Sequence, residues 1–291
     1  MSAVIDDRSV RELQVSPATE LVGEIVTWDV GSAKGITYSD VMNALSASGL
    51  DPDSASELSP RNAFSRACKE LKKQRVIRKL DDQTDVIKFQ FTTENLHQNK
   101  FEYDYEASLE LNKHTGIIYC PESVDLAQHA QDLLNEALVN RTAADVTRLV
   151  QKLFGKNGDL FPINPHKGVA YFVPNQFKEF TSKIEQFMET LGGKIWRFPV
   201  PKGTSSGDSA VRDAVKNGIR QMIQDLVDTC NGWTDTTRDS TMHNRFKDFK
   251  MIEFKVNAYS QFLSYEREKI EHALELAKRR MVERVKEVKN I

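Results

Sequence analysis

The sequence predicts a helix-rich α+β fold, and two kinds of periodicity predict it. Residues 101–112 alternate apolar and polar side chains at every step, which is the period of a strand with one wet face. The C-terminal part instead repeats its apolar residues at steps of three and four, which is the spacing of a helix. With 291 residues, the chain is also long enough for about two domains, each with a core of its own.

The N-terminal region, at 17–97 after a flexible lead at 1–16, is predicted to contain three helices and a β-hairpin. An apolar face that begins near Pro17 has helical spacing, and Thr37 is expected to cap a second helix. Ser59 and the proline after it are expected to begin a third helix. Two β-branched or aromatic runs, "VIRKL" and "VIKFQFTT", flank the Asp-rich turn "DDQTD" and predict the hairpin.

The middle region, at 101–202, is predicted to be a small α+β domain. After its alternating strand come two capped amphipathic helices, which are expected to begin at Ser123 and Thr142. Further on, a helix separates two short apolar runs at 168–174 and 194–201. Because strand, helix and strand have the size of a crossover unit here, these two strands are expected to run parallel.

The C-terminal region, at 203–291, is predicted to consist of long helices. One of them is expected to begin at Ser240 and to extend toward the C-terminus. Its last part carries a coiled-coil-like seam of apolar residues, namely Ile270, Leu274, Ala277, Met281, Val285 and Val288. The segment at 240–291 is therefore predicted to mediate self-association or the docking of a protein partner.

The helix expected after Ser59 is strongly basic on one side. From residue 60 to 80 the chain has eight Lys/Arg and one Glu, whereas the rest of the first hundred residues has five bases and fourteen acids. On a helical wheel, one contiguous exposed arc holds Arg61, Asn62, Ser65, Arg66, Lys69, Lys72 and Lys73. Arg and Lys along a helix can neutralise several phosphates, and Arg, Asn and Ser can hydrogen-bond base edges. These residues are therefore predicted to bind duplex DNA.

The order of these predicted elements resembles the winged helix-turn-helix family of DNA-binding proteins over residues of about 17–93. In this resemblance, "TYSDVMNAL" matches the positioning helix, and "SPRNAFSRACKELKKQRVIRKL" matches the recognition helix plus the first wing strand. The turn "DDQTD" matches the wing tip. The family implies that the third helix binds DNA while the wing lies against the DNA backbone. Residues of about 101–230 also resemble an uncharacterised domain of bacterial and phage proteins.

Three functions remain open from the sequence. The leading one is a non-enzymatic DNA-binding protein of bacterial or phage type. The alternative is a protein–protein interaction scaffold that uses the N-terminal module for docking, which an acidic wing tip and a net charge of −2 favour. The third is an enzyme with a site in the α+β domain, for which His166 and Lys167 are the first candidates because they lie in the turn that enters a strand.

The residues that usually build metal, cofactor and membrane sites are sparse. Cys68, Cys120 and Cys230 lie far apart, which predicts free buried thiols in a reducing compartment and not a disulfide framework. The six histidines have no metal-ligand spacing, and no phosphate-binding loop or nucleophile elbow is present, so no metal, cofactor or catalytic residue is predicted. No apolar run is long enough for a signal peptide or a membrane span, which predicts a cytoplasmic protein without a membrane partner.

Overall fold

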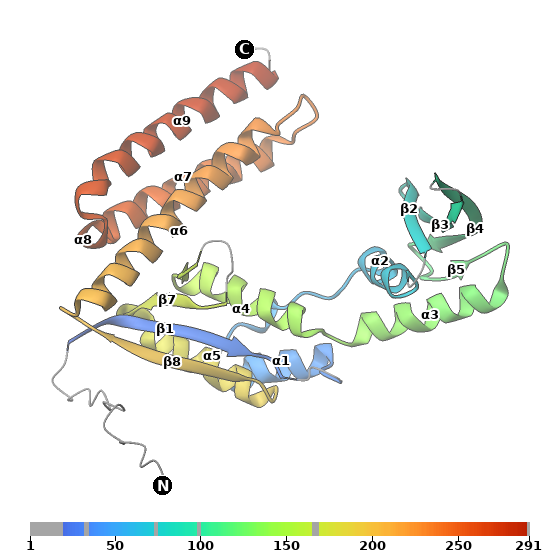
Figure 1. Cartoon of the computed structure of the whole chain (residues 1–291), viewed down its shortest axis with the longest axis horizontal. Helices are drawn as coiled ribbons and strands as arrows, with labels where there is room; N and C mark the ends of the chain where they lie inside the picture. Colours follow the sequence, from blue (N-terminus) through green and yellow to red (C-terminus); the bar gives the residue numbers. More distant parts are fainter. Residues whose placement is uncertain (1–19, 32–34, 73–74, 98–99, 165–168, 290–291) are drawn as a thin grey trace, which may run out of the picture. The chain divides into compact units, whose positions relative to one another are not determined.

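The structure of the chain is a computed structural model, and it separates into two units that are each discontinuous in sequence (Figure 1). The residues that it describes are 20–31, 35–72, 75–97, 100–164 and 169–289. Unit 1 draws these from Met1–Asp29, Leu153–Glu185 and Lys194–Ile291, and unit 2 draws them from Val30–Lys152 and Gln186–Gly193. The sequence predicted consecutive domains, whereas each unit combines segments that are distant in the chain.

Among the described residues, unit 1 contains a four-stranded antiparallel sheet with β1 in its interior. Its strands, in spatial order, are β6 (Phe161–Pro162), β7 (Tyr171–Pro174), β1 (Leu21–Asp29) and β8 (Lys194–Pro201). Because β7 and β8 are both antiparallel to β1, they run parallel to each other, as predicted, but they are not neighbours. Between them along the chain lie the short helix η2 (Asn175–Phe177) and the helix α5 (Lys178–Thr190).

The helix predicted near Pro17 is wrong, because residues 21–29 form the strand β1. The segment "LVGEIVTWD" is rich in β-branched and aromatic residues, which favour a strand that has partners on both sides. Gly23 shows how closely β1 fits, since a Cβ built there would lie 2.3 Å from the main-chain oxygen of Val173 on β7. The three-helix order of the winged-helix resemblance is therefore not formed in the part of the chain that the structure describes.

Unit 1 continues as a bundle of long helices that share one core. The helices are α6 (Ser205–Asn231), α7 (Asp239–Ala258), α8 (Ser260–Leu263), η3 (Ser264–Glu266) and α9 (Arg267–Lys289). Figure 1 shows α6, α7 and α9 side by side, and their buried residues form a single cluster. The helix predicted from Ser240 therefore ends at Ala258, and the chain reverses direction before α9 through a turn in which Ser264 has a φ of 46°.

The apolar stripe of α9 packs against other helices of unit 1. Ile270, Leu274, Ala277 and Met281 are buried in the core shared with α6 and α7, and Val285 and Val288 pack against that core. The predicted coiled-coil-like seam thus finds its partner helices within the same unit. A role in self-association would need other residues of the segment.

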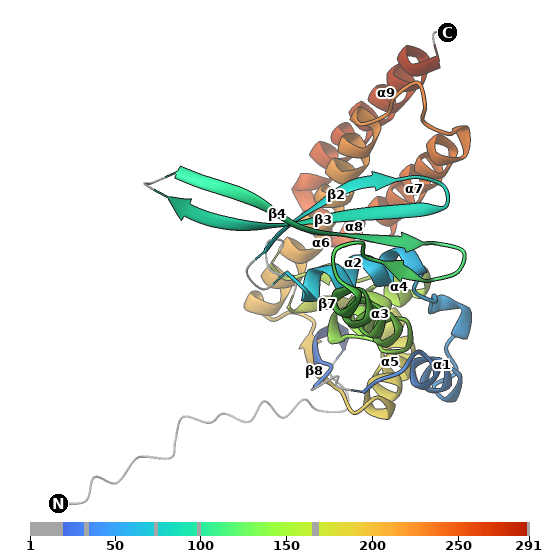
Figure 2. The same ribbon diagram turned by 90° about the vertical axis from the view of Figure 1, so that its right-hand side faces the viewer.

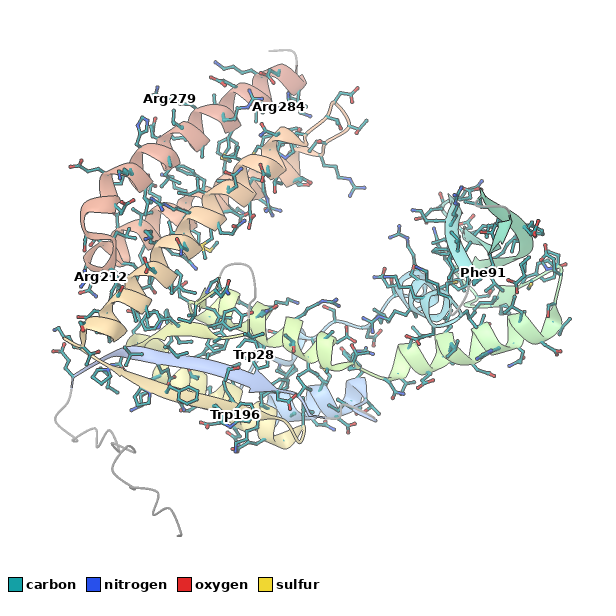
Figure 3. All side chains as sticks on the ribbon, in the orientation of Figure 1. Trp28, Phe91, Trp196, Arg212, Arg279 and Arg284 are labelled. Carbon is teal, nitrogen blue, oxygen red and sulfur yellow. The ribbon has the colours of Figure 1, made fainter. Side chains whose placement is uncertain are left out.

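Unit 2 packs helices against a second antiparallel sheet, whose described strands lie in the order β2-β3-β4-β5. The strands are β2 (Arg75–Asp82), β3 (Val86–His97), β4 (Lys100–Asn112) and β5 (Ile118–Tyr119). The helices are α1 (Tyr38–Ala47), η1 (Pro52–Ser54), α2 (Pro60–Glu70), α3 (Val124–Val139) and the first part of α4 (Ala143–Asn157). Figure 2 shows β2, β3 and β4 as neighbouring strands. Their core, which includes the fully buried Phe91 (Figure 3), is shared with α2 and α3.

Several local predictions for unit 2 are confirmed. The side chains of Thr37, Ser59 and Ser123 cap α1, α2 and α3, and the predicted hairpin forms from β2 and β3. The cysteines of unit 2, Cys68 and Cys120, are free and buried as predicted, and so is Cys230 in α6 of unit 1. However, β3 also pairs with β4 along its whole length, so the predicted boundary at 97–101 falls at the turn of one hairpin.

Candidate nucleic-acid interface and adjacent cavity

Helix α2 forms as predicted and turns its basic side away from the core. The Ser59 hydroxyl accepts a hydrogen bond from the Asn62 amide at 3.4 Å, and Pro60 occupies the first helical position, where no amide hydrogen is needed. The buried side of the helix is made of Ala63, Phe64, Ala67 and Cys68. Five of the predicted DNA-binding residues, namely Arg61, Asn62, Ser65, Arg66 and Lys69, belong to α2 and lie outside this buried side, whereas Lys72 lies in the turn after the helix.

Arg61 is held by the acidic end of the β2–β3 hairpin. Its Nε donates to Asp82 Oδ2 at 3.0 Å, and its Nη2 is bonded to the same oxygen. Lys79 and Lys113 also donate to this carboxylate, at 3.2 and 2.8 Å. Hydrogen bonds from Arg61 and Lys113 hold the pKa of Asp82 well below its ordinary value. Arg61 would have to leave this network to contact a DNA base.

Two further residues of the predicted DNA-binding set are engaged inside unit 2. Arg66 binds Asp145 of α4 through both amino nitrogens, at 2.7 and 2.6 Å, in the bidentate geometry that makes such pairs strong. The Ser65 hydroxyl donates to the main-chain oxygen of Arg61 at 3.1 Å. Arg61, Ser65 and Arg66 would therefore each have to give up a partner within unit 2 in order to read a base.

The other described residues of the predicted DNA-binding set are exposed to solvent. Asn62 and Lys69 are exposed on α2, Lys72 is exposed in the turn that follows the helix, and Lys73 lies outside the described residues. Neither Lys69 nor Lys72 forms an ion pair with any residue that the structure describes. Lys69 and Lys72 therefore face solvent without an ion pair among the described residues, whereas Arg61 and Arg66 already hold acids.

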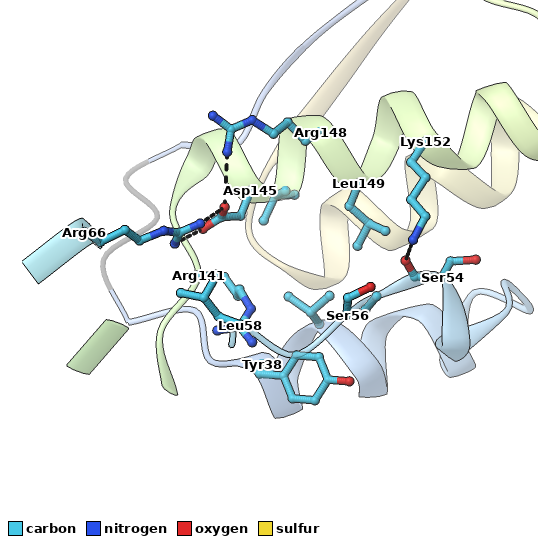
Figure 4. A pocket seen from close by; sticks show the side chains of 13 residues that line it. Tyr38, Ser54, Ser56, Leu58, Arg66, Arg141, Asp145, Arg148, Leu149 and Lys152 are labelled. Carbon is cyan, nitrogen blue, oxygen red and sulfur yellow. Dashed lines mark hydrogen bonds and ion pairs between the residues drawn. The ribbon is translucent and has the colours of Figure 1, made fainter. Parts of the chain in front are cut away.

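A cavity of about 180 Å³ lies beside α2 within unit 2 (Figure 4). Its apolar lining comes from Tyr38, Val41, Leu58, Val146 and Leu149, and its cationic lining comes from Arg66, Arg141, Arg148 and Lys152. Sequence reasoning missed this site because its residues are scattered between positions 38 and 152. Only the spacing of Arg148 and Lys152, four apart on α4, could have suggested that two of them share a face.

Asp145 is the carboxylate around which these cations gather. Besides its two bonds from Arg66, its carboxylate lies 3.6 Å from Arg148 Nη1 and accepts hydrogen bonds from the amide and the hydroxyl of Thr142. The Thr142 hydroxyl in turn accepts from the Asp145 amide at 3.2 Å, which completes the predicted capping box at the start of α4. Burial acts to raise the pKa of Asp145, but the hydrogen bonds from Arg66 and Thr142 outweigh it and lower the pKa to about 2. Asp145 is therefore anionic at neutral pH and leaves the cavity with an excess of positive charge.

Arg141 is the most unusual of the four cations. Arg141 is only 8% exposed, and its guanidinium carbon lies 4.7 Å from the centre of the Tyr38 ring. Its Nη1 donates to the main-chain oxygens of Leu138 and Asn140 at 3.1 and 3.0 Å. Its Nη2 is buried and has no hydrogen-bond partner among the residues that the structure describes. Burial lowers the pKa of this guanidinium from its ordinary value. A buried cation with an unused donor is costly unless something pairs with it.

Lys152 closes the other end of the cavity. It donates to the main-chain oxygen of Ser54 at 2.7 Å and so ties α4 to the segment at 54–58 (Figure 4). Because its partner is a neutral carbonyl, this bond leaves the charge of Lys152 uncompensated. The lysine therefore adds to the positive potential of the cavity.

Other candidate sites gather less chemistry. His166 and Lys167, the first candidates for an enzymatic site, lie outside the described residues. Within the described part of the chain, no group of three or more His, Cys, Asp or Glu side chains could hold a metal ion. None of the helices in the same described ranges is both long and apolar enough to cross a membrane.

Comparison with known proteins gives a family but no activity. The model of a family of unknown function, DUF6744, matches residues 21–289, and the chain therefore belongs to that family. No curated protein and no solved structure matches the chain. The matched residues include both units, and the family has no assigned function, so a function can be inferred only from the sites of this chain.

Proposed function

We propose that this member of the DUF6744 family is a non-enzymatic protein that binds duplex DNA through the outer side of α2. The observation that carries the proposal is the segregation of charge on this helix and the turn after it, where Lys69 and Lys72 are exposed while Asp82 and Asp145 are bonded to Arg61 and Arg66. Exposed lysines on a helix neutralise DNA phosphates and release their counterions, whatever the net charge of the whole protein.

The proposed binding has low sequence specificity. Bidentate contacts from Arg to guanine are the commonest specific contacts in the major groove, and both arginines of α2 are already bonded to carboxylates. Lysine contacts to phosphate position a protein on DNA but carry no direct sequence information. Asn62 is then the exposed residue of α2 best suited to a base edge. Affinity is expected in the range of nonspecific binding, at a Kd of about 10⁻⁴ to 10⁻⁶ M.

The test compares two lysine pairs in the full chain. Binding of a short labelled duplex is measured by fluorescence anisotropy at several salt concentrations for the wild type, for K69Q/K72Q and for K250Q/K269Q. The control lysines, Lys250 on α7 and Lys269 on α9, are exposed in unit 1, so both variants lose the same charge. Each phosphate contact contributes about −0.9 to the slope of log K against log salt, so K69Q/K72Q is expected to lose about two contacts from that slope.

Two results would overturn this proposal. One is an equal loss of affinity in the two variants, which would mean that only net charge matters. The other is an absence of binding at low salt by a chain that is folded according to its circular dichroism. Single-stranded DNA that binds more tightly than the duplex would replace the duplex as the proposed ligand.

A second candidate function is a protein-docking scaffold, and one exposed surface favours it. Met251 and Phe254 lie three residues apart on α7 and are 43% and 71% exposed. Residues at this spacing share a face of a helix, and adjacent exposed apolar side chains are typical of interfaces. The proposal for this surface is self-association through α7, which keeps the predicted role of the segment at 240–291 but moves it away from the buried seam of α9.

Light scattering after gel filtration tests this second function. The wild type is expected to form a dimer at micromolar concentrations, and M251S/F254S is expected to be a monomer with an unchanged helical content. A wild type that is monomeric at tens of micromolar would contradict it.

A further inference from the structure

We propose that the cavity lined by Arg66, Arg141, Arg148 and Lys152 binds a small organic phosphate, namely a phosphate monoester on a compact apolar or aromatic body. This site is separate from the proposed DNA-binding side of α2, because the two depend on different cations. The proposal therefore stands whether or not the chain binds DNA.

The charge of the cavity selects an anion. Four cations and one carboxylate line it, and Glu57, which lies in the adjoining segment, acts on the charge of Arg141 from close by. Two positive charges therefore remain in excess even when both acids are counted. A phosphate monoester carries a charge of about −1.5 to −2 at neutral pH, which matches this excess better than a carboxylate does.

The unused donor of Arg141 shows that the site is incomplete without a ligand. The residue is more than nine-tenths buried, lines the cavity, and has a buried Nη2 without a partner in the described part of the chain (Figure 4). The positive charges of Arg66 and Arg141 also act against each other across the site. An anion in the cavity would relieve both effects. Guanidinium groups suit this role because their planar donors match the oxygens of a phosphate.

A buried nitrogen without a partner is not by itself a ligand site, as a comparison of Arg141 with Arg245 shows. Its Nε is also buried without a partner among the described residues, but its Nη1 pairs with Asp248 at 2.9 Å. The charge of Arg245 is therefore balanced within α7. Arg141 forms no ion pair with any residue that the structure describes, and Asp145, which acts on its charge, is already bonded to both amino nitrogens of Arg66, so the charge of Arg141 is balanced only in part.

The apolar lining and the size of the cavity define the rest of the ligand. Val41, Val146 and Leu149 are buried, and Tyr38 and Leu58 are half-buried, so the lining between the cations is largely apolar. A volume of about 180 Å³ is below the ~300 to 1,000 Å³ of most drug-sized sites. It holds a phosphate with one ring or a short aliphatic body, and it excludes a DNA duplex.

The test is a calorimetric titration of the full chain with phenyl phosphate, which joins a phosphate monoester to one aromatic ring. Inorganic phosphate lacks the apolar body, and benzoate replaces the phosphate by a carboxylate. Phenyl phosphate is expected to bind, and both reference compounds are expected to bind at least about tenfold more weakly. Inorganic phosphate that binds as tightly would overturn the apolar part of the proposal, and benzoate that binds as tightly would overturn its phosphate specificity.

Three variants assign the binding to the cavity. R148Q/K152Q removes two side chains that are exposed at its rim, and R141M removes the buried guanidinium; each is expected to weaken the binding of phenyl phosphate at least about tenfold, since a charge-assisted hydrogen bond is lost. K69Q/K72Q should bind phenyl phosphate as the wild type does. Unchanged affinity in R148Q/K152Q, or no binding of phenyl phosphate to the wild type at millimolar concentration, would overturn the proposal. Because R148Q/K152Q alters exposed residues, the test holds even if R141M fails to fold.

Discussion

Two buried cations of this chain, Lys255 in unit 1 and Arg141 in unit 2, are hidden from solvent to nearly the same degree but are compensated differently. Lys255 is 7% exposed and is paired with Asp159, which is itself 6% exposed and also bonded to the Tyr259 hydroxyl. Burial and the bond to Asp159 raise the pKa of Tyr259. Arg141 is 8% exposed, donates to main-chain oxygens only, and retains one unpartnered nitrogen within the described residues.

The difference separates a structural ion pair from a ligand site. In unit 1 the charge is balanced inside the protein, since Asp159 neutralises Lys255 and also accepts a hydrogen bond from Tyr259, to which Gln176 donates at 3.2 Å. In unit 2 a cavity lies beside the unbalanced cation, and other cations line the same cavity. A buried cation that is paired with a buried acid, as Lys255 is, therefore indicates a structural ion pair. A buried cation without such a pair beside a cavity, as Arg141 is, indicates a ligand site.

The largest expected effect in this comparison comes from the balanced pair. In K255M the Asp159 carboxylate stays buried without its cation, so the free energy of unfolding is expected to fall by about 3 to 5 kcal/mol. Urea denaturation followed by circular dichroism measures this loss. Replacing both residues, as in K255M/D159L, should restore part of it, because no charge is then buried alone. A loss below about 1 kcal/mol in K255M would mean that water reaches Asp159 and that the pair is not structural.

The second effect is a pH dependence that depends on Asp145. Because the folded pKa of Asp145 is lowered from 3.8 to about 2, this group stabilises the folded chain above about pH 4, and the stabilisation is lost as the pH falls toward 2. The shift corresponds to at most about 2 kcal/mol. Denaturation of the wild type and D145N is expected to differ by roughly this amount at pH 6, by about half of it near pH 3, and to converge only at about pH 2 and below. A difference that is the same at every pH would show that only the cap of α4 was removed.

The third effect is the change in stability of R141M, which is expected to be smaller than the effect on its ligand binding. In R141M no buried carboxylate loses its partner, because Arg141 donates only to two main-chain oxygens. The free energy of unfolding is therefore expected to change by less than about 1 kcal/mol, while the binding of phenyl phosphate is lost. If R141M were as unstable as K255M, Arg141 would be a structural residue, and the contrast between the two cations would disappear.

The smallest effect is expected at the acidic end of the hairpin. Arg61 is half-exposed, and Asp82 keeps its bonds to Lys79 and Lys113 when Arg61 is replaced. R61Q should therefore show no measurable change in the urea midpoint, as is usual for exposed ion pairs. A gain in DNA affinity in D82N, where Arg61 is released, would be the complementary result. A clear loss of stability in R61Q would show that this network stabilises unit 2.

The local features of unit 2 could be predicted because they depend on residues close in sequence. The caps at Thr37, Ser59 and Ser123 follow from side chains that bond amides within the next turn, and the buried side of α2 follows from its apolar spacing. The β2–β3 hairpin follows from its turn. In each case the stabilising partner lies within a few positions or in the adjoining strand.

The features that were missed depend on partners far away in the chain. β1 has helical apolar spacing, but it becomes a strand because β7 and β8, more than a hundred residues later, pair with both of its edges. The seam of α9 is buried by α6 in the same chain. The cavity of unit 2 joins α1, α2 and α4, and the pairing of Arg66 with Asp145 spans 79 positions. No local pattern encodes such contacts.

The most direct test of the contrast is an NMR titration that observes the arginine side chains individually. The Nε–Hε signals of Arg141, Arg148 and Arg61 are assigned from the spectra of R141M, R148Q and R61Q, and phenyl phosphate is then added to the wild type. The signals of Arg141 and Arg148 are expected to shift together along one binding curve, while the signal of Arg61 stays in place. Shifts at Arg61 that equal those at Arg141, or no shift at Arg141, would contradict the claim that the unbalanced buried guanidinium marks an anion site.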